Sequence, residues 1–245
     1  MSPDFHFLVL LRSVLMLAVG SVPVFLWKHR HRTAPAVLAL GGAAWVIAVA
    51  SKVAWALPLN AIVRHFLERQ LGTSSAKVAF SAYLGLLSGV FEVGLVLVAS
   101  RTIRRLRAAS SADAIGFGLA FGGVEAAILA LAGLAALAHP QAFPVASLVT
   151  GPLERASALV LHVVTCVLVF GPQFRARPWR AFALSFFYKS GIDAIAAYGL
   201  LELGIQTSTL KLVAFEAVIA LLVAPALFIG RRTSPTMPAV ASADV

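Results

Sequence analysis

Four ionisable side chains lie deep within apolar stretches of this sequence: Glu92, Glu125, His162 and Asp193. Counting from the start of each stretch at about 1.5 Å per residue places all four at similar middle depths. An unpaired carboxylate at such a depth would take up a proton or bind a cation, because burial disfavours its charge. Ionisable groups in such segments are costly, so each one is a candidate functional residue.

These four side chains can meet only if the elements that carry them form one bundle. We predict that they gather into a single polar cluster, since an apolar environment offers no better partner. Two interpretations stay open, a functional pocket and polar contacts that merely hold helices together. Gly116, Gly118, Gly122 and Gly123 precede Glu125 and permit close helix packing.

The composition indicates a membrane protein. The 245 residues are 60% hydrophobic and only 12% charged, and the mean hydropathy is +0.91. A soluble domain cannot bury that much apolar surface. The net charge of +10 falls in short segments between apolar runs, which favours a topological role over nucleic-acid binding. Cys166 is the single cysteine, so an internal disulfide and a paired-cysteine metal site are excluded.

About seven stretches are long enough to cross a bilayer as helices, and none alternates as a strand would. They run approximately over residues 6–27, 34–57, 78–100, 113–138, 153–172, 180–203 and 211–230. We therefore predict an all-α, polytopic membrane helix bundle, with one domain over residues 1–232 and a disordered cytoplasmic tail over 233–245. Residues 60–71 read as an amphipathic helix, either at the outer interface or within an ordered loop.

Basic residues indicate the orientation. "KHRHR", "RTIRRLR", "RARPWR" and "RR" follow the first, third, fifth and seventh stretches, and together they hold 12 of the 20 Lys and Arg residues. The positive-inside rule then places these segments in the cytoplasm, the N-terminus outside and the C-terminus inside. Arg12 and Glu216 lie near the outer ends of their stretches and can reach the surface there.

Four blocks of the sequence resemble a known family. They are "SGVFEVG" (88–94), "GFGLAFGGVEAAIL" (116–129), "ERASALVLHVVTCVLVF" (154–170) and "KSGIDAIAAY" (189–198). In this order they are similar to blocks of the YhfC family of intramembrane metalloproteases, which is related to the PrsW and CAAX-processing proteases. The resemblance implies a multi-helix fold of the bacterial inner membrane, a metal between helices, and hydrolysis of peptide bonds in or near the bilayer.

The resemblance also implies roles for individual residues. Glu92, Glu125, His162 and Asp193 would be the catalytic set, and Glu154 and Arg155 belong to the third block. If the protein is active, His162, Glu125 and Asp193 would hold zinc. Such a site needs several ligands, an open position for water, and a glutamate that accepts the proton of that water.

The sequence departs from the family pattern at two expected ligands. Phe121 stands where the family has a histidine before the paired glycines, and Lys189 stands for the histidine of a His-x-x-x-Asp block. Val93 also replaces the second acid of a Glu-Glu pair. Phenylalanine cannot bind a metal, and a protonated lysine repels one, so we expect no resident cofactor. Lys189 and Asp193 are four residues apart on one helical face.

We therefore predict a pseudoprotease in which Lys189, among Glu92, Glu125 and Asp193, replaces the charge of the metal. Such a protein would bind a membrane protein or peptide partner within the lipid bilayer. An active metalloprotease and a small transporter or channel are the alternatives. The first would lose activity in Glu125→Gln, and the second would show solute flux that Lys189→Ala changes. At the outer surface, Arg155 is expected to reach the interface or to pair with Glu202.

Overall fold

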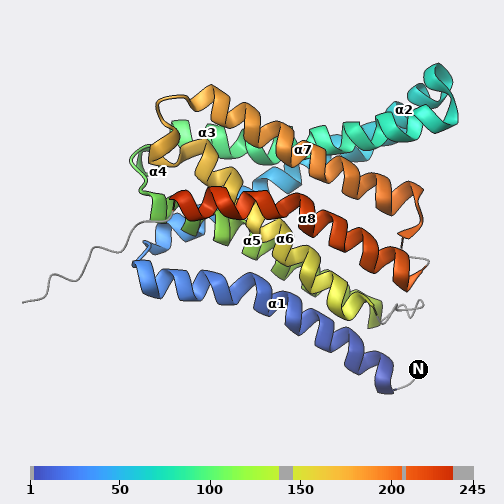
Figure 1. Cartoon of the computed structure of the whole chain (residues 1–245), viewed down its shortest axis with the longest axis horizontal. Coiled ribbons are helices and arrows are strands. Elements are labelled where there is room, and N and C mark those ends of the chain that lie inside the picture. Colours follow the sequence, from blue (N-terminus) through green and yellow to red (C-terminus); the bar gives the residue numbers. More distant parts are fainter. Residues whose placement is uncertain (1–2, 138–145, 206–207, 234–245) are drawn as a thin grey trace, which may run out of the picture.

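The computed structural model describes residues 3–137, 146–205 and 208–233, and every element in these ranges is helical. The helices are α1 (Pro3–His31), α2 (Pro35–Ser88), α3 (Gly94–Thr102), α4 (Arg104–Arg107), α5 (Ser111–Leu134), α6 (Ser147–Phe170), α7 (Pro178–Glu202) and α8 (Thr209–Thr233). A π-helical segment, η1 (Gly89–Val93), joins α2 to α3, and short 3-10 turns, η2 (Ala135–Leu137) and η3 (Pro172–Phe174), follow α5 and α6. The long helices lie side by side in one bundle (Figure 1).

Within the described ranges, five helical stretches are long and apolar enough to cross a membrane. They are Phe5–His31, Pro35–Thr102, Ser111–Leu134, Ser147–Phe170 and Thr209–Ala226. The prediction of an all-α, multi-pass membrane bundle is thus confirmed. The orientation of the bundle stays a prediction, and the predicted tail beyond residue 233 lies outside the described residues.

The second of these stretches contains two of the predicted spans. Gly72 interrupts α2 with a left-handed φ of 72° and a ψ of 165°, a conformation that favours glycine. The chain reverses there, and the tip of the resulting hairpin projects beyond the other helices (Figure 1). We name residues 35–71 the first limb of α2 and residues 73–88 its second limb.

The predicted amphipathic helix over residues 60–71 exists but is not a separate element. It continues the first limb without a break. At 1.5 Å per residue this limb is about 55 Å long, whereas the hydrocarbon core of a bilayer is about 30 Å thick. The prediction of a distinct interfacial helix was therefore wrong, because a run of helix-forming residues simply extends the preceding span.

Helix α7 matches the predicted stretch 180–203 but is not among the five apolar spans. It carries Lys189 and Asp193 in its middle, and two charged residues lower the hydropathy of a helix of this length. The helix packs closely against α2 and α6. Lys189 and Asp193, which lower the hydropathy of α7, are also candidate site residues.

Helix α5 forms the centre of the bundle and packs against α1, α2 and α6. Its Phe117 and Phe121 are fully buried, and Cys166 of α6 is buried beside the same core. Glycines allow the close approach. A Cβ atom added at Gly118 would lie 2.6 Å from Val163 Cα, and one at Gly41 would lie 2.4 Å from the carbonyl oxygen of Phe117.

We expect Gly118→Ala to destabilise the protein by about 1–3 kcal/mol, because the new methyl group forces α5 and α6 apart. Gly191→Ala is the matched control, since a Cβ atom there has no neighbour within 4 Å. Glycine is a weak helix former, so the control should be neutral or more stable by about 0.5–1 kcal/mol. Thermal unfolding in detergent compares the two variants, and equal effects would contradict the tight α5–α6 contact.

The basic segments gather at one end of the bundle. In Figure 1 the end of α1, the α3–α4 turn, the α6–α7 connection and the end of α8 lie at the same end, opposite the tip of the α2 hairpin. Two hydrogen bonds link these segments, from Trp27 Nε1 to the carbonyl oxygen of Ala112 (3.0 Å) and from Arg175 to that of Ala109. The charge pattern predicts that these four basic segments share one side of the membrane, and they do lie at the same end of the bundle (Figure 1).

Candidate functional site

Glu125 of α5 is the centre of a buried polar group. Its Oε2 lies 2.5 Å from His162 Nε2 and accepts a hydrogen bond of 3.1 Å from Trp45 Nε1. Its Oε1 accepts a hydrogen bond from Arg155. Both carboxylate oxygens are therefore occupied, by side chains from α2 and α6. We call Glu125, His162, Trp45 and Arg155 the Glu125 group.

Arg155 connects this group to the protein surface. One of its terminal nitrogens contacts Glu125 and the other contacts Glu154, whose side chain is 43% exposed. The guanidinium itself is buried. The predicted partner, Glu202, is wrong: Glu202 pairs instead with Lys77 at 2.9 Å and with Arg64 at 3.5 Å. The guanidinium of Arg155 therefore balances the negative charge of Glu125 inside the bundle.

A second group of charges lies between α2, η1 and α7. Lys189 Nζ is 3.2 Å from Glu92 Oε2 and 2.5 Å from Asp193 Oδ2. Lys52 Nζ is 2.5 Å from Glu92 Oε1 and donates to Ser88 Oγ at 3.3 Å. We call Lys52, Glu92, Lys189 and Asp193 the ion-pair cluster. Glu92 and Lys189 are each 5% exposed, so these charges depend on one another rather than on solvent.

Local structure brings the two sides of the ion-pair cluster together. Glu92 lies in the π-helical segment η1, a geometry often found at functional sites. Gly85 of the second limb of α2 and Gly89 of η1 let these two segments approach α7. A Cβ atom at Gly85 would lie 2.2 Å from the carbonyl oxygen of Ser190, and one at Gly89 would lie 2.1 Å from Ser190 Oγ.

The four side chains predicted to converge fall into these two neighbouring groups. Glu125 contacts His162, whereas Lys189 joins Glu92 to Asp193. The groups are near enough for Glu92 to interact electrostatically with His162 and Glu125. The ring of Phe121 lies 4.8 Å, centre to centre, from that of His162.

Three features differ from the sequence-based expectation. Trp45 was not anticipated in the site, because a tryptophan in an apolar helix gives no signal of its hydrogen bond. Lys52 was recognisable as an ionisable residue within a span, which is the signal that could have placed it. Glu216 does not reach the surface but is 5% exposed.

A small cavity gives access to the ion-pair cluster. It has a volume of about 240 Å³ and lies where the two limbs of α2 meet α7. Lys52, Ser88 and Asp193 supply its polar wall, and Val53, Ala56, Leu84, Leu87 and Ala197 supply its apolar wall. Asp193 is near the middle of α7, and Lys52 is near the middle of the first limb. The cavity therefore lies away from the ends of both helical segments.

Salt bridges also join the two limbs of α2 to helix α7 on the side of the bundle that carries the tip of the α2 hairpin. Arg64 of the first limb and Lys77 of the second limb both pair with Glu202 at the end of α7. We call these three residues the ionic clasp. It lies beyond the cavity along the same three segments.

The fold and the site together define a multi-pass membrane protein with charged side chains buried between its helices. Its family is established by sequence: residues 13–140, just over half of the chain, match the YhfC intramembrane metalloprotease family. The chain belongs to this family. No curated protein and no solved structure matches it.

The family match confirms the resemblance for the first two sequence blocks. It contains Trp45, Lys52, Glu92, Phe121 and Glu125 and ends before the other two blocks. The match gives the family and the range but no role for any single residue, so the positions assigned to Glu92, Phe121, Glu125, His162, Lys189 and Asp193 all stay predictions.

The residues present do not fit a zinc site of the kind that the family implies. Within the described ranges no three His, Cys, Asp or Glu side chains are grouped as metal ligands. His162 and Glu125 are together, but Arg155 neutralises Glu125. Glu92 and Asp193 are held by lysine ammonium groups, which repel a divalent cation.

Proposed function

We propose that this protein is a non-catalytic member of the YhfC family, in which the ion-pair cluster takes the place of the metal site. It uses the cavity between α2 and α7 to bind a membrane protein or peptide in the bacterial inner membrane. Family membership and the multi-pass fold support a site among the membrane-spanning helices. The lysine ammonium groups of the ion-pair cluster, which repel a metal ion, support the loss of catalysis.

The position of Lys189 carries this proposal. Its ammonium lies between Glu92 and Asp193, where a metal ion would need their oxygens. The two groups together contain three cations, Lys52, Arg155 and Lys189, and three carboxylates, Glu92, Glu125 and Asp193. Adding a divalent cation would leave an unbalanced charge in a medium of low dielectric, which is costly.

The cavity supports the binding of a partner. Its volume of about 240 Å³ suits one or two side chains rather than a whole peptide segment. Lys52 and Asp193 are about a quarter exposed and so are not saturated by the cluster. A transmembrane segment with a polar side chain can hydrogen-bond to them while its apolar surface packs on Val53 and Leu84. Polar contacts of this kind hold helices together in membranes.

We expect purified protein to carry no stoichiometric zinc after exposure to the metal and desalting. Elemental analysis of the detergent-solubilised chain makes the measurement. One tightly held zinc per chain, with peptidase activity that Glu125→Gln abolishes, would establish the active metalloprotease instead. Solute flux into proteoliposomes that Lys189→Ala alters would establish a transporter.

A photo-reactive amino acid at Val53, in the wall of the cavity, should crosslink to a membrane protein or peptide in cells. The matched control is Leu221 of α8, which is 72% exposed and does not line the cavity. A protein adduct that forms from Val53 and not from Leu221 supports the proposal. Lipid adducts alone from both positions would contradict it.

A further inference from the structure

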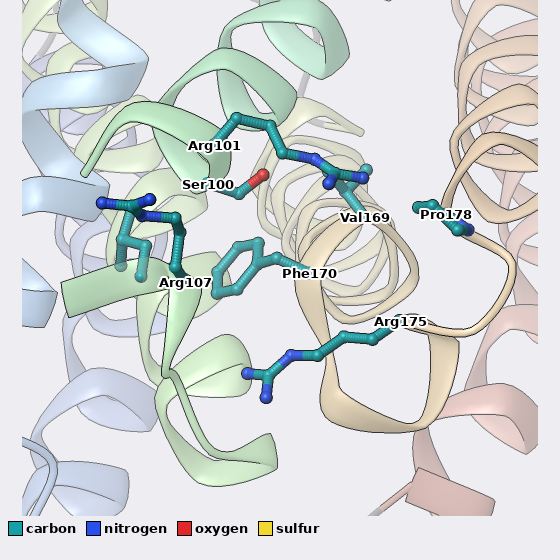
Figure 2. Close-up of a pocket in the computed structure, with 8 residues that line it drawn as sticks. Ser100, Arg101, Arg107, Val169, Phe170, Arg175 and Pro178 are labelled. Atoms are coloured by element: carbon teal, nitrogen blue, oxygen red, sulfur yellow. The ribbon is translucent and has the colours of Figure 1, made fainter. Parts of the chain in front are cut away.

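A separate hollow at the basic end of the bundle lies between α3–α4 and the α6–α7 connection. It has a volume of about 240 Å³, and three of its lining residues are arginines: Arg101, Arg107 and Arg175. Figure 2 shows Arg101 and Arg175 extending across it on either side of Phe170, with Arg107 at one edge. None of the residues that line the hollow belongs to the Glu125 group or to the ion-pair cluster.

The floor of this hollow is preformed. Leu106, Val169 and Phe170 are buried beneath it, each 5% exposed or less. Arg175 donates a hydrogen bond to the carbonyl oxygen of Ala109, which fixes one edge of its guanidinium and leaves the other N–H groups free to bind a ligand. Ser100 already donates its hydroxyl proton to the carbonyl oxygen of Leu97 at 2.7 Å, so arginines supply the donors.

The charge around the hollow is uncompensated. Residues 100–113 and 171–180 contain seven arginines, no lysine and one acidic residue, Asp113. That carboxylate is engaged in the capping box of α5 with Ser110. In the part of the chain that the structure describes, Arg101, Arg107 and Arg175 make no ion pair. Arginine binds phosphate through two parallel hydrogen bonds, which lysine cannot do.

Membrane topology alone does not require this arrangement. The positive-inside rule is satisfied by lysine and arginine anywhere in a loop and needs no shaped hollow. Trp179, next to Pro178 of the hollow, is 69% exposed, as is typical of aromatic residues at the lipid headgroup level. The volume lies below the range of pockets for whole drug-sized ligands, so a single small group is the expected occupant.

From these observations we propose that the hollow binds a phosphate group, through the guanidinium groups of Arg101, Arg107 and Arg175. An anionic phospholipid headgroup and a free phosphate share this chemistry. The exposed Trp179 beside the hollow favours the headgroup, and the experiment separates the two sources.

The test uses the full chain in nanodiscs of phosphatidylcholine with increasing phosphatidylglycerol, and native mass spectrometry counts the retained lipids at high salt. We expect phosphatidylglycerol to be retained in preference to phosphatidylcholine. The triple variant Arg101→Gln, Arg107→Gln and Arg175→Gln should bind it about tenfold more weakly. The matched control, Arg104→Gln, Arg105→Gln and Arg180→Gln, removes the same charge outside the hollow and should retain most of the binding.

Inorganic phosphate added to phosphatidylcholine nanodiscs provides the second arm. If phosphate binds to the wild type and not to the hollow variant, the ligand is a soluble anion. If phosphatidylglycerol binds the wild type more tightly than the hollow variant and inorganic phosphate binds neither, the ligand is the headgroup. Equal binding by both triple variants in both arms would overturn the proposal.

Arg175→Gln alone could unfold its segment, because Arg175 contacts the backbone of Ala109. The double variant Arg101→Gln and Arg107→Gln keeps that contact, and it should still weaken the same ligand several-fold more than Arg104→Gln with Arg105→Gln. An unchanged affinity in this folded double variant would likewise overturn the proposal.

Discussion

Replacing Lys189 with methionine is expected to destabilise the protein by about 3–5 kcal/mol, the usual cost of breaking a buried ion pair from one side. The substitution leaves Glu92 with Lys52 alone and removes the ammonium that lies 2.5 Å from Asp193. Thermal unfolding in detergent, followed by circular dichroism, measures the loss.

The control for this prediction is Lys77→Met. Lys77 pairs with Glu202 in the ionic clasp but is 38% exposed, so its loss should cost no more than about 1 kcal/mol. Adding Asp193→Asn to Lys189→Met should recover part of the stability, because it removes the uncompensated carboxylate. If Lys189→Met and Lys77→Met unfold alike, the ion-pair cluster does not stabilise the bundle.

The double variant Phe121→His with Lys189→His is expected to gain a zinc site, with occupancy rising to about one ion per chain. Phe121 is next to His162, and Lys189 lies between Glu92 and Asp193. The change removes one cation from the centre and adds two imidazoles, so it lowers the excess positive charge that a divalent ion would create and raises the number of ligands. Elemental analysis and the thermal shift on adding zinc measure the gain.

A matched control adds two histidines elsewhere, by Phe182→His with Lys211→His. It should remain free of zinc. The single variants Phe121→His and Lys189→His should bind weakly, since each supplies only one new ligand. A folded double variant without zinc would show that these two positions are not equivalent to the ligand positions of the family, and the pseudoprotease proposal would lose its basis.

The hydropathy and charge patterns of the sequence predicted most of the fold. The apolar stretches coincide with the helices, because only a helix satisfies its own backbone hydrogen bonds in lipid. The exception in the hairpin has a physical cause. Residues 60–71 form helix equally well inside a long limb and as a separate surface element, and periodicity alone does not separate the two.

The candidate site was only partly predictable. Burial of an ionisable group can be read from its surroundings in the chain, which is why Glu92, Glu125, His162 and Asp193 were identified. Its partner depends on how the helices rotate and cross. Arg155 contacts Glu125 rather than Glu202 because the glycines of α5 bring α6 close, and the π-helical turn at Glu92 has no marker in the sequence.

The ionic clasp restricts how a partner can arrive. Glu202 ties Arg64 and Lys77 together at the tip side of the three segments that enclose the cavity. With these three segments joined at that end, we expect the cavity to open toward the lipid, so that a ligand reaches it by diffusing within the plane of the bilayer. Its encounter rate then depends on the number of ligand molecules per unit area of membrane, and a peptide dissolved in water has no direct path.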